Sequence, residues 1–241
     1  MEVVGAKADA LCACGAGPRG GRDTARVANP RGARNPKDVV ARGYDAIALR
    51  YAEWASAIQA PTMRWVRELL AALPDGSDIL ELGCGRGVPA TRELARRHHV
   101  TGVDISAAQI ALARHHVPEA VFVHADAAEL ELPTDSYDAV VSLFMFGHLP
   151  RPEQGPLLRR IAAWLRPAGL LLTTLGTGDS PGEIDPDWLG APMFFASFDP
   201  ETNRELLRAA GFELLRDEVV PQEEQGHGLV SFMWVLARRP E

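Results

Sequence analysis

Three glycines at alternate positions, Gly83, Gly85 and Gly87, follow directly on the apolar run "ILEL" and precede a proline-led segment. Glycines let a backbone approach a ligand closely, and a helix that starts after them offers free amide groups. The pattern differs from the dinucleotide fingerprint G-x-G-x-x-G, because Val88 stands at the sixth position. The loop therefore predicts a nucleotide-like ligand without fixing which one.

Acidic residues accompany this loop. Asp104 ends the next apolar run, 21 residues after Gly83, where a carboxylate can accept hydrogen bonds from ribose hydroxyls. Glu81 precedes the loop, and there it would repel a pyrophosphate but suits a ligand that carries an ammonium group. Each of these residues, taken alone, also has a structural explanation. The glycines could serve tight packing, and Asp104 could cap a helix. A third acidic residue, Asp126 in the later stretch "HADAAEL", could belong to a turn.

Short apolar runs alternate with helical patterns through most of the chain, which predicts a parallel sheet with both faces covered. The expected strands are 79–83, 99–105, 120–126, 137–146 and 170–176, and the expected helices are 38–55, 60–73, 89–98, 106–117, 153–169 and 200–212. Two further strands, 212–221 and 228–239, follow each other without a helix and must form an antiparallel hairpin. The Gly/Pro/aromatic stretch 176–199 is expected to be a long loop.

The ordered set "ELGCGRG", "GVDIS", "HADAAEL", "YDAVVSLFMFGHL" and "WLRPAGLLL" resembles the successive motifs of class I S-adenosylmethionine-dependent methyltransferases. The resemblance covers about residues 38–239. It implies a Rossmann-like, doubly wound α/β fold with a seven-stranded sheet, mostly parallel, that ends in an antiparallel hairpin and carries helices on both faces. It also implies S-adenosyl-L-methionine as the cofactor, S-adenosyl-L-homocysteine as the product, and an enzyme that transfers methyl groups.

The same resemblance assigns cofactor-binding roles to particular positions. Glycines of the loop would approach the methionine part, Asp104 would hold the ribose, Ile105 would pack on the adenine, and Asp126 with the Ala127 amide would bind the adenine edge. Ser142 would offer its backbone carbonyl to the methionine ammonium group. The full implied set is Tyr51, Glu81, Gly83, Cys84, Gly85, Gly87, Asp104, Ile105, Asp126, Ala127 and Ser142. Cys84, flanked by glycines, is expected to be a small filler and not a nucleophile.

Methyl transfer from a sulfonium needs alignment and exclusion of water more than it needs a base. A base matters for an alcohol or phenol acceptor, and His148 and Tyr51 are the candidates for a catalytic role, although His148 could equally be structural. The acceptor-binding candidates come from the N-terminal helix, from the region after the fourth strand and from the loop 176–199. They are Tyr44, Trp54, Phe144, Phe146, Trp188, Phe194 and Phe195.

The overall composition is that of an ordinary globular chain, with 241 residues, 46% apolar residues and a formal net charge of −7. The first 37 residues carry a net charge of +4, so the remaining residues carry a net charge of −11. We expect residues 1–37 to be a flexible arm and 38–241 to be one methyltransferase domain. Three cysteines, two of them in "CAC", predict neither a disulfide framework nor a metal site. No membrane span and no secretion signal is recognisable, and we expect a cytoplasmic location.

The acidic body argues against nucleic acid as a partner. We therefore expect a small, aromatic or apolar acceptor, as in specialised metabolism, with the methylated atom left open among O, N, S and C. Three alternatives remain: a regulatory protein that binds the cofactor without transfer, an RNA or protein methyltransferase, and an NAD-dependent oxidoreductase. The sequence gives no indication of the oligomeric state.

Overall fold

A computed structural model of the protein describes residues 35–58 and 60–241, so nearly all of the expected arm lies outside the described residues. The helical elements are α2 (Pro36–Ala57), α3 (Thr62–Ala71), α4 (Ala90–Leu94), α5 (Ala107–His116), η2 (Ala127–Glu129), η3 (Phe146–His148), α6 (Arg151–Trp164) and α7 (Pro200–Ala209). The strands are β1 (Asp78–Leu82), β2 (His99–Asp104), β3 (Val121–His124), β4 (Tyr137–Ser142), β5 (Leu165–Gly176), β6 (Ser180–Trp188), β7 (Ala191–Ser197), β8 (Glu213–Glu224) and β9 (Gly228–Arg238).

Seven strands form the central sheet in the order β3-β2-β1-β4-β5-β9-β8. The pairs among β1 to β5 are parallel, whereas β9 runs antiparallel to both β5 and β8. This confirms the predicted seven-stranded, mostly parallel sheet with a C-terminal hairpin. The strand order reverses its direction between β1 and β4, and open α/β sheets bind ligands at such a point, beyond the carboxyl ends of the strands.

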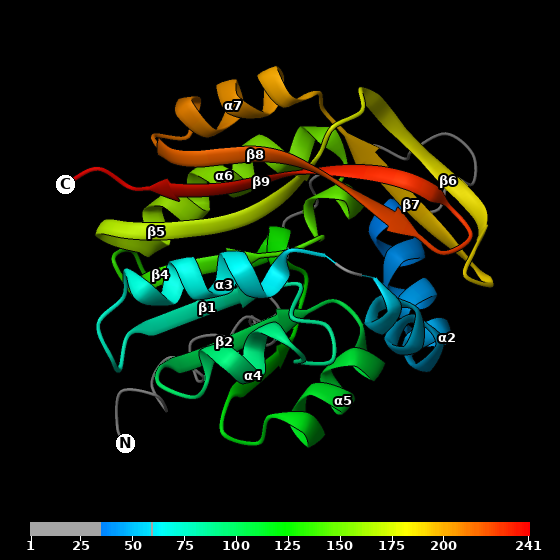
Figure 1. Ribbon diagram of the computed structural model, residues 1–241, viewed down its shortest axis with the longest axis horizontal. Helices are drawn as coiled ribbons and strands as arrows, with labels where there is room; N and C mark the ends of the chain where they lie inside the picture. Colours follow the sequence, from blue (N-terminus) through cyan, green and yellow to red (C-terminus); the bar gives the residue numbers. More distant parts are fainter. Residues whose placement is uncertain (1–34, 59) are drawn as a thin grey trace, which may run out of the picture.

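Helices cover both faces of the sheet, with α3, α4 and α5 on one face and α6 and α7 on the other (Figure 1). Successive strand residues contribute to opposite layers, because side chains alternate along a strand. In β4, Val140 packs with Leu157 and Leu207 of α6 and α7, while Val141 packs with Trp65 of α3. Strands buried on both sides in this way explain the nearly continuous apolar runs of the sequence.

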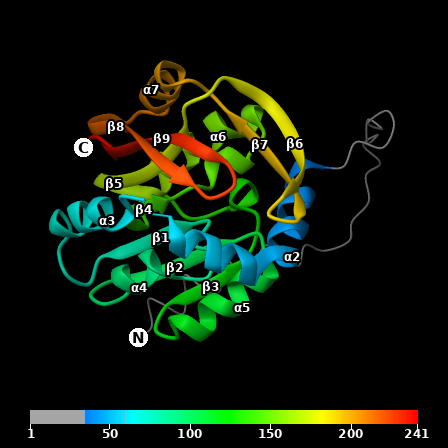
Figure 2. The ribbon, with the colours of Figure 1, turned by 45° about the vertical axis from the view of Figure 1, so that its right-hand side comes forward.

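The segment 176–199, expected to be a loop, is instead an antiparallel ribbon of β6 and β7. Leu189 and Gly190 both have positive φ, 52° and 90°, which is the conformation of a tight two-residue hairpin turn. Prolines at 181, 186 and 192 concealed the strands in the sequence. They are tolerated here because each strand of a two-stranded ribbon has a free edge. The ribbon stands beside α2 at one end of the sheet (Figures 1 and 2).

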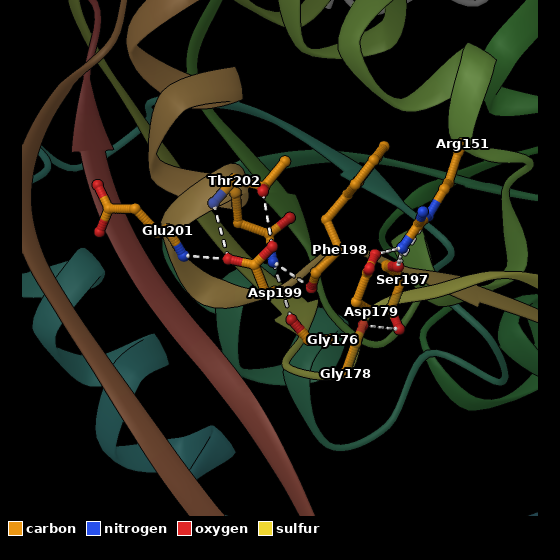
Figure 3. Close-up of polar contacts among 10 residues, drawn as sticks. Arg151, Gly176, Gly178, Asp179, Ser197, Phe198, Asp199, Glu201 and Thr202 are labelled. Atoms are coloured by element: carbon orange, nitrogen blue, oxygen red, sulfur yellow. Dashed lines mark hydrogen bonds and ion pairs between the residues drawn. The ribbon is translucent and has the colours of Figure 1, made fainter.

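The base of this ribbon is fastened to the body of the protein (Figure 3). The Arg151 guanidinium at the start of α6 donates from Nε to the Ser197 carbonyl at 2.9 Å and pairs with Asp179. Ser197 Oγ donates to the Gly178 carbonyl at 2.5 Å. Just beyond, Asp199 caps α7 by accepting from the amides of Glu201 and Thr202 at 3.0 and 3.1 Å (Figure 3), a role that aspartate commonly has at the start of a helix.

Candidate functional site

A pocket opens at the carboxyl ends of β1, β2 and β4 and is closed on one side by α2. Its empty space is about 680 Å³ when the open solvent at its mouth is included. Ten of the residues singled out in the sequence line it: Tyr44, Tyr51, Gly83, Gly85, Asp104, Ile105, Asp126, Ala127, Phe144 and His148. The fold thus brings most of the expected cofactor residues together with part of the expected acceptor residues.

The glycine loop is locked in a conformation that only glycine adopts readily. Gly83, Gly85 and Gly87 have φ of 73°, 53° and 78°, in the left-handed region. Asp104 fixes the loop, because its carboxylate accepts from the Gly85 amide at 2.8 Å and from the Ser106 amide at 2.9 Å. Burial raises the pKa of Asp104, although these two amide bonds oppose the shift. Asp104 lines the pocket, and its carboxylate has acceptor positions beyond the two that these amides use.

Gly85 and Gly87 serve different purposes. A Cβ at Gly85 would meet nothing closer than Gln109 Oε1 at 4.0 Å and would project beside the pocket. A Cβ at Gly87 would instead press on Ala113 and Val117 at 3.4 and 3.2 Å, so Gly87 is required for the packing of α5 against the loop. Cys84 lies in the core beside α5, where burial raises the pKa of its thiol.

Several buried polar groups around the pocket have no partner among the described residues. They include Glu81 Oε2 and both side-chain atoms of Gln109, which is 1% exposed and lines the pocket. Burial raises the pKa of Glu81 to about 7. Unpaired buried polar atoms cost free energy and are expected where a ligand completes them. The Ser142 hydroxyl is also buried without a partner among the described residues, whereas the Ser142 carbonyl, which was expected to bind the methionine ammonium group, already accepts from the Thr173 hydroxyl at 2.9 Å.

Gln109 was not identified from the sequence. It lies three residues after Ser106, which caps α5 by accepting from the Gln109 amide at 3.2 Å. Side chains one turn into a helix lean back toward its N-terminus, so this spacing was the available signal. The side-chain amide of Gln109 therefore lies beside the glycine loop at Gly85.

Lys37 closes the far end of the pocket. The helix α2 begins at Pro36, so Lys37 belongs to its first turn and not to the expected arm. Its ammonium group lies 2.5 Å from Asp126 and 2.9 Å from Glu153, and it is 8% exposed as a residue. Burial alone would lower the pKa of Lys37, but the bonds to Asp126 and Glu153 outweigh it and raise the pKa. Asp126 thus pairs with Lys37 and also accepts from the Ala128 amide at 2.8 Å.

At the opposite end, aromatic side chains from α2 and the β6–β7 ribbon form a contiguous group. We call it the aromatic cluster, and it consists of Tyr44, Tyr51, Trp54, Trp188 and Phe195. Neighbouring rings lie 5.1 to 5.9 Å apart between centroids, which is the usual range for edge-to-face and tilted pairs. Tyr44 and Tyr51 line the pocket directly, and the other three rings stand behind them.

Two hydrogen bonds hold His148 in place, and one of them joins it to the aromatic cluster. Its Nδ1 lies 2.9 Å from the Phe194 carbonyl, and its Nε2 lies 2.8 Å from the Tyr44 hydroxyl. A carbonyl can only accept, so Nδ1 carries the proton and Nε2 accepts from Tyr44. Burial lowers the pKa of His148 to about 4, which keeps the imidazole neutral near pH 7. The sequence predicted His148 as a candidate base, but it gave no reason to pair it with Tyr44.

Other expected acceptor residues do not reach the pocket. Phe146 is 1% exposed and packs in the main core with Leu157 and Leu158, because its 3₁₀ turn directs it toward α6. Phe194 contributes its carbonyl to His148, while its ring packs on Gly182. Within residues 35–58 and 60–241 there is no group of three metal-ligating side chains, and no helix of this part is long and apolar enough to cross a membrane.

Comparison with known proteins places the glycine loop inside a defined family. Residues 79–169 match the methyltransferase domain family. The chain is 33% identical over 154 residues to 27-O-demethylrifamycin SV methyltransferase of Amycolatopsis mediterranei, covering 55% of this chain and 56% of the relative. It is 35% identical over 99 residues to ubiquinone biosynthesis O-methyltransferase of Aeromonas salmonicida, covering 39% and 41%. These matches span about half the length of the curated relatives or less.

Solved structures share the fold at lower identity. The 1,6-didemethyltoxoflavin-N1-methyltransferase of Burkholderia thailandensis, solved with 1,6-didemethyltoxoflavin and S-adenosylhomocysteine, aligns with a TM-score of 0.66 at 22% identity. That alignment covers 88% of this chain and 94% of the other. Magnesium protoporphyrin IX methyltransferase of Synechocystis, solved with bound cofactor, aligns with a TM-score of 0.67 at 17% identity. This second alignment covers 87% of this chain and 99% of the other. At these identities the likeness is one of fold.

Proposed function

We propose that this protein, which belongs to the class I S-adenosylmethionine-dependent methyltransferases, transfers a methyl group from S-adenosyl-L-methionine to a small molecule. One observation carries the proposal. Unpartnered buried polar atoms of Glu81 and Gln109 stand beside a left-handed glycine loop that Asp104 holds in place. This donor and acceptor set suits a ligand with ribose hydroxyls and an ammonium group.

In this proposal the cofactor's parts are divided among the strand ends. The backbone at Gly83 and Gly85 faces the methionine part, Asp104 accepts from the ribose, and Ile105 packs on the adenine. Asp126 keeps its bond to Lys37 while it accepts from the adenine amino group, since a carboxylate has about four acceptor positions. We add Gln109 to the cofactor residues because its amide has no other partner.

The bound cofactor supplies an electrophilic methyl group on a positively charged sulfur. The residues of this chain align the acceptor with that methyl group and exclude water. Tyr44 and His148 dispose of the acceptor's proton: Tyr44 Oη takes it while the Tyr44 proton moves to His148 Nε2 over the 2.8 Å bond. The Phe194 carbonyl holds the imidazole in the tautomer that this transfer requires.

We propose a small, aromatic or apolar acceptor, of the kind found in specialised metabolism. The aromatic cluster at the pocket end supports this, because such rings favour planar and apolar ligands. The names of two similar proteins, the 27-O-demethylrifamycin SV and the 1,6-didemethyltoxoflavin methyltransferases, also refer to small molecules.

Formation of S-adenosylhomocysteine tests the proposal. The full chain is incubated with S-adenosylmethionine and pools of aromatic alcohols, phenols and amines, and products are followed by mass spectrometry. We expect acceptor-dependent S-adenosylhomocysteine together with an acceptor heavier by one methylene. Binding of the cofactor without transfer to any pool would favour the regulatory alternative and contradict the proposal.

The buried carboxyl of Glu81 leads to a pH prediction. Burial raises its pKa to about 7 from the ordinary 4.5, so below pH 7 the free protein holds a proton there. An ammonium group on the ligand favours the carboxylate, and binding therefore releases this proton. We expect the affinity for S-adenosylhomocysteine to rise as the pH increases through the pKa of Glu81.

Titration calorimetry near pH 6, in two buffers with different ionisation enthalpies, measures that proton. We expect a release that approaches one proton per site in the wild-type protein and is absent in Glu81→Gln. Equal release in the two proteins would assign the proton to another group.

A further inference from the structure

The turn of the β8–β9 hairpin lies near α2 and the β6–β7 ribbon (Figure 1), the two elements that carry the aromatic cluster. Trp54 Nε1 donates to the Gln225 carbonyl in this turn at 3.0 Å. The His227 ring lies 6.2 Å from the Trp54 ring and 6.3 Å from the Trp188 ring. The turn that follows β8 therefore packs against the aromatic cluster.

Two polar side chains at the end of β8, just before this turn, are buried. Gln222 and Glu224 alternate with the exposed Glu223, so they point to the same face of the strand. They are 6% and 8% exposed. Gln222 Nε2 donates to Glu224 Oε1 at 2.7 Å, and Gln222 Oε1 has no partner in the described part of the chain. The pair thus presents a carboxylate and a free amide oxygen, both of which accept hydrogen bonds.

The carboxylate of Glu224 has no positive partner. No Lys, Arg or His of residues 35–58 and 60–241 lies within 4.0 Å of it, whereas the partly buried Asp126 has Lys37. Arg86, on the glycine loop, bonds the Ser56 hydroxyl at 2.9 Å. A buried charge without a partner is costly, and buried carboxylates are ordinarily paired or fully hydrogen-bonded. The arrangement lacks a positively charged donor.

The surrounding aromatic rings also suit a positively charged group. Tyr51, Trp54 and Trp188 lie 5.5 to 5.9 Å from one another between centroids, and the faces of such rings attract cations. Tyr51 also lines the pocket. Its pKa is raised to about 12, chiefly by burial and in part by the negative charges of Asp104 and Glu224. Glu224 is thus within electrostatic reach of the residues that line the pocket.

We infer that Gln222 and Glu224 bind a protonated primary or secondary amine of the methyl acceptor, with the faces of the aromatic cluster beside it. The N–H groups of such an amine satisfy Glu224 and Gln222 Oε1 together, which a quaternary ammonium could not do. This inference rests on the proposed function, because the amine belongs to the molecule that is methylated in the adjoining pocket.

A matched pair of probes tests the inference in the full chain. Tyramine carries a protonated amine at neutral pH, and 4-ethylphenol is the same molecule without it. Both are titrated by calorimetry into the protein saturated with S-adenosylhomocysteine. We expect tyramine to bind at least about tenfold more tightly, the order that one charge-assisted hydrogen bond provides.

Glu224→Gln should abolish this preference, because it removes the charge and keeps the shape. Glu223→Gln is the control: it removes the same charge from the neighbouring, exposed position and should leave the preference intact. Equal binding of the two probes by the wild-type protein, or a preference that survives Glu224→Gln, would overturn the inference.

Two further titrations distinguish a failure of the inference from a failure of the proposed function. If Glu224→Gln lost a preference for S-adenosylmethionine over S-adenosylhomocysteine instead, Glu224 would serve the sulfonium and the inference would be wrong. Failure of the wild-type protein to bind S-adenosylhomocysteine at all would contradict the proposed function, and it would be seen before either probe is added.

Discussion

Gly85→Val is expected to weaken S-adenosylhomocysteine binding by at least about 100-fold. Two effects combine at this position. The residue has φ of 53°, which a β-branched side chain tolerates poorly, and its new Cβ would project beside Gln109 into the space that the cofactor occupies in our proposal. A displaced loop would also lose the 2.8 Å bond from the Gly85 amide to Asp104. Titration calorimetry on wild type and variant measures the loss.

Gly76→Val provides the matched control. Gly76 has φ of 77°, and its Cβ would meet no atom within 4 Å, but it lies in the turn before β1, away from the pocket. The Gly76→Val variant should therefore suffer only the backbone strain, which lowers the free energy of unfolding by about 1 to 2 kcal/mol. Its affinity for S-adenosylhomocysteine should stay unchanged. If the folded Gly85→Val protein bound S-adenosylhomocysteine as tightly as Gly76→Val does, the assignment of the loop would be wrong.

Tyr44→Phe and His148→Phe are each expected to lower kcat for a hydroxyl acceptor by about 100-fold, the lower end of the range for general-base catalysis. Each removes one end of the 2.8 Å hydrogen bond through which the proton leaves, and each retains a ring for the packing of the aromatic cluster. KM for S-adenosylmethionine should change little. Steady-state kinetics with the acceptor found in the screen measures both constants, and His115→Asn, on the exposed end of α5, is the control.

The double variant distinguishes a relay from separate contributions. Because Tyr44 and His148 act on one proton, the double variant should be no slower than the single variants. The pH profile gives a second test. His148 must be neutral to accept, and burial lowers its pKa to about 4, so kcat should stay level from pH 8 to about pH 5 and fall only near pH 4. Additive losses in the double variant, or an inflection near pH 6.5, would contradict the relay.

The sheet and its cofactor edge were predictable from local patterns. Apolar runs that end in Leu82, Asp104 and Ser142 are strands buried on both faces, and such strands have nearly continuous apolar sequences. Parallel pairing then requires their carboxyl ends to lie at one edge. This is why Gly83, Gly85 and Asp104, which are far apart in sequence or carried on different strands, meet in the pocket.

The contacts that cross between elements were not predictable. Lys37 joined to Asp126, and Tyr44 joined to His148, depend on how α2 crosses the end of the sheet, and no local pattern in α2 encodes that angle. The β6–β7 ribbon was concealed because its prolines are acceptable only where a strand has a free edge. Gln109 and Gln222 read as ordinary polar residues in the sequence, and only the burial of their side-chain atoms without partners gives them significance.

Titration of the full chain with S-adenosylhomocysteine and, separately, with NAD tests the central claim most directly. Both ligands contain adenosine, but only the first carries an amino acid, and only the second carries a pyrophosphate that Glu81 would repel. We predict saturable binding of one S-adenosylhomocysteine per chain and no saturable binding of NAD. Tight binding of NAD without any binding of S-adenosylhomocysteine would contradict the account.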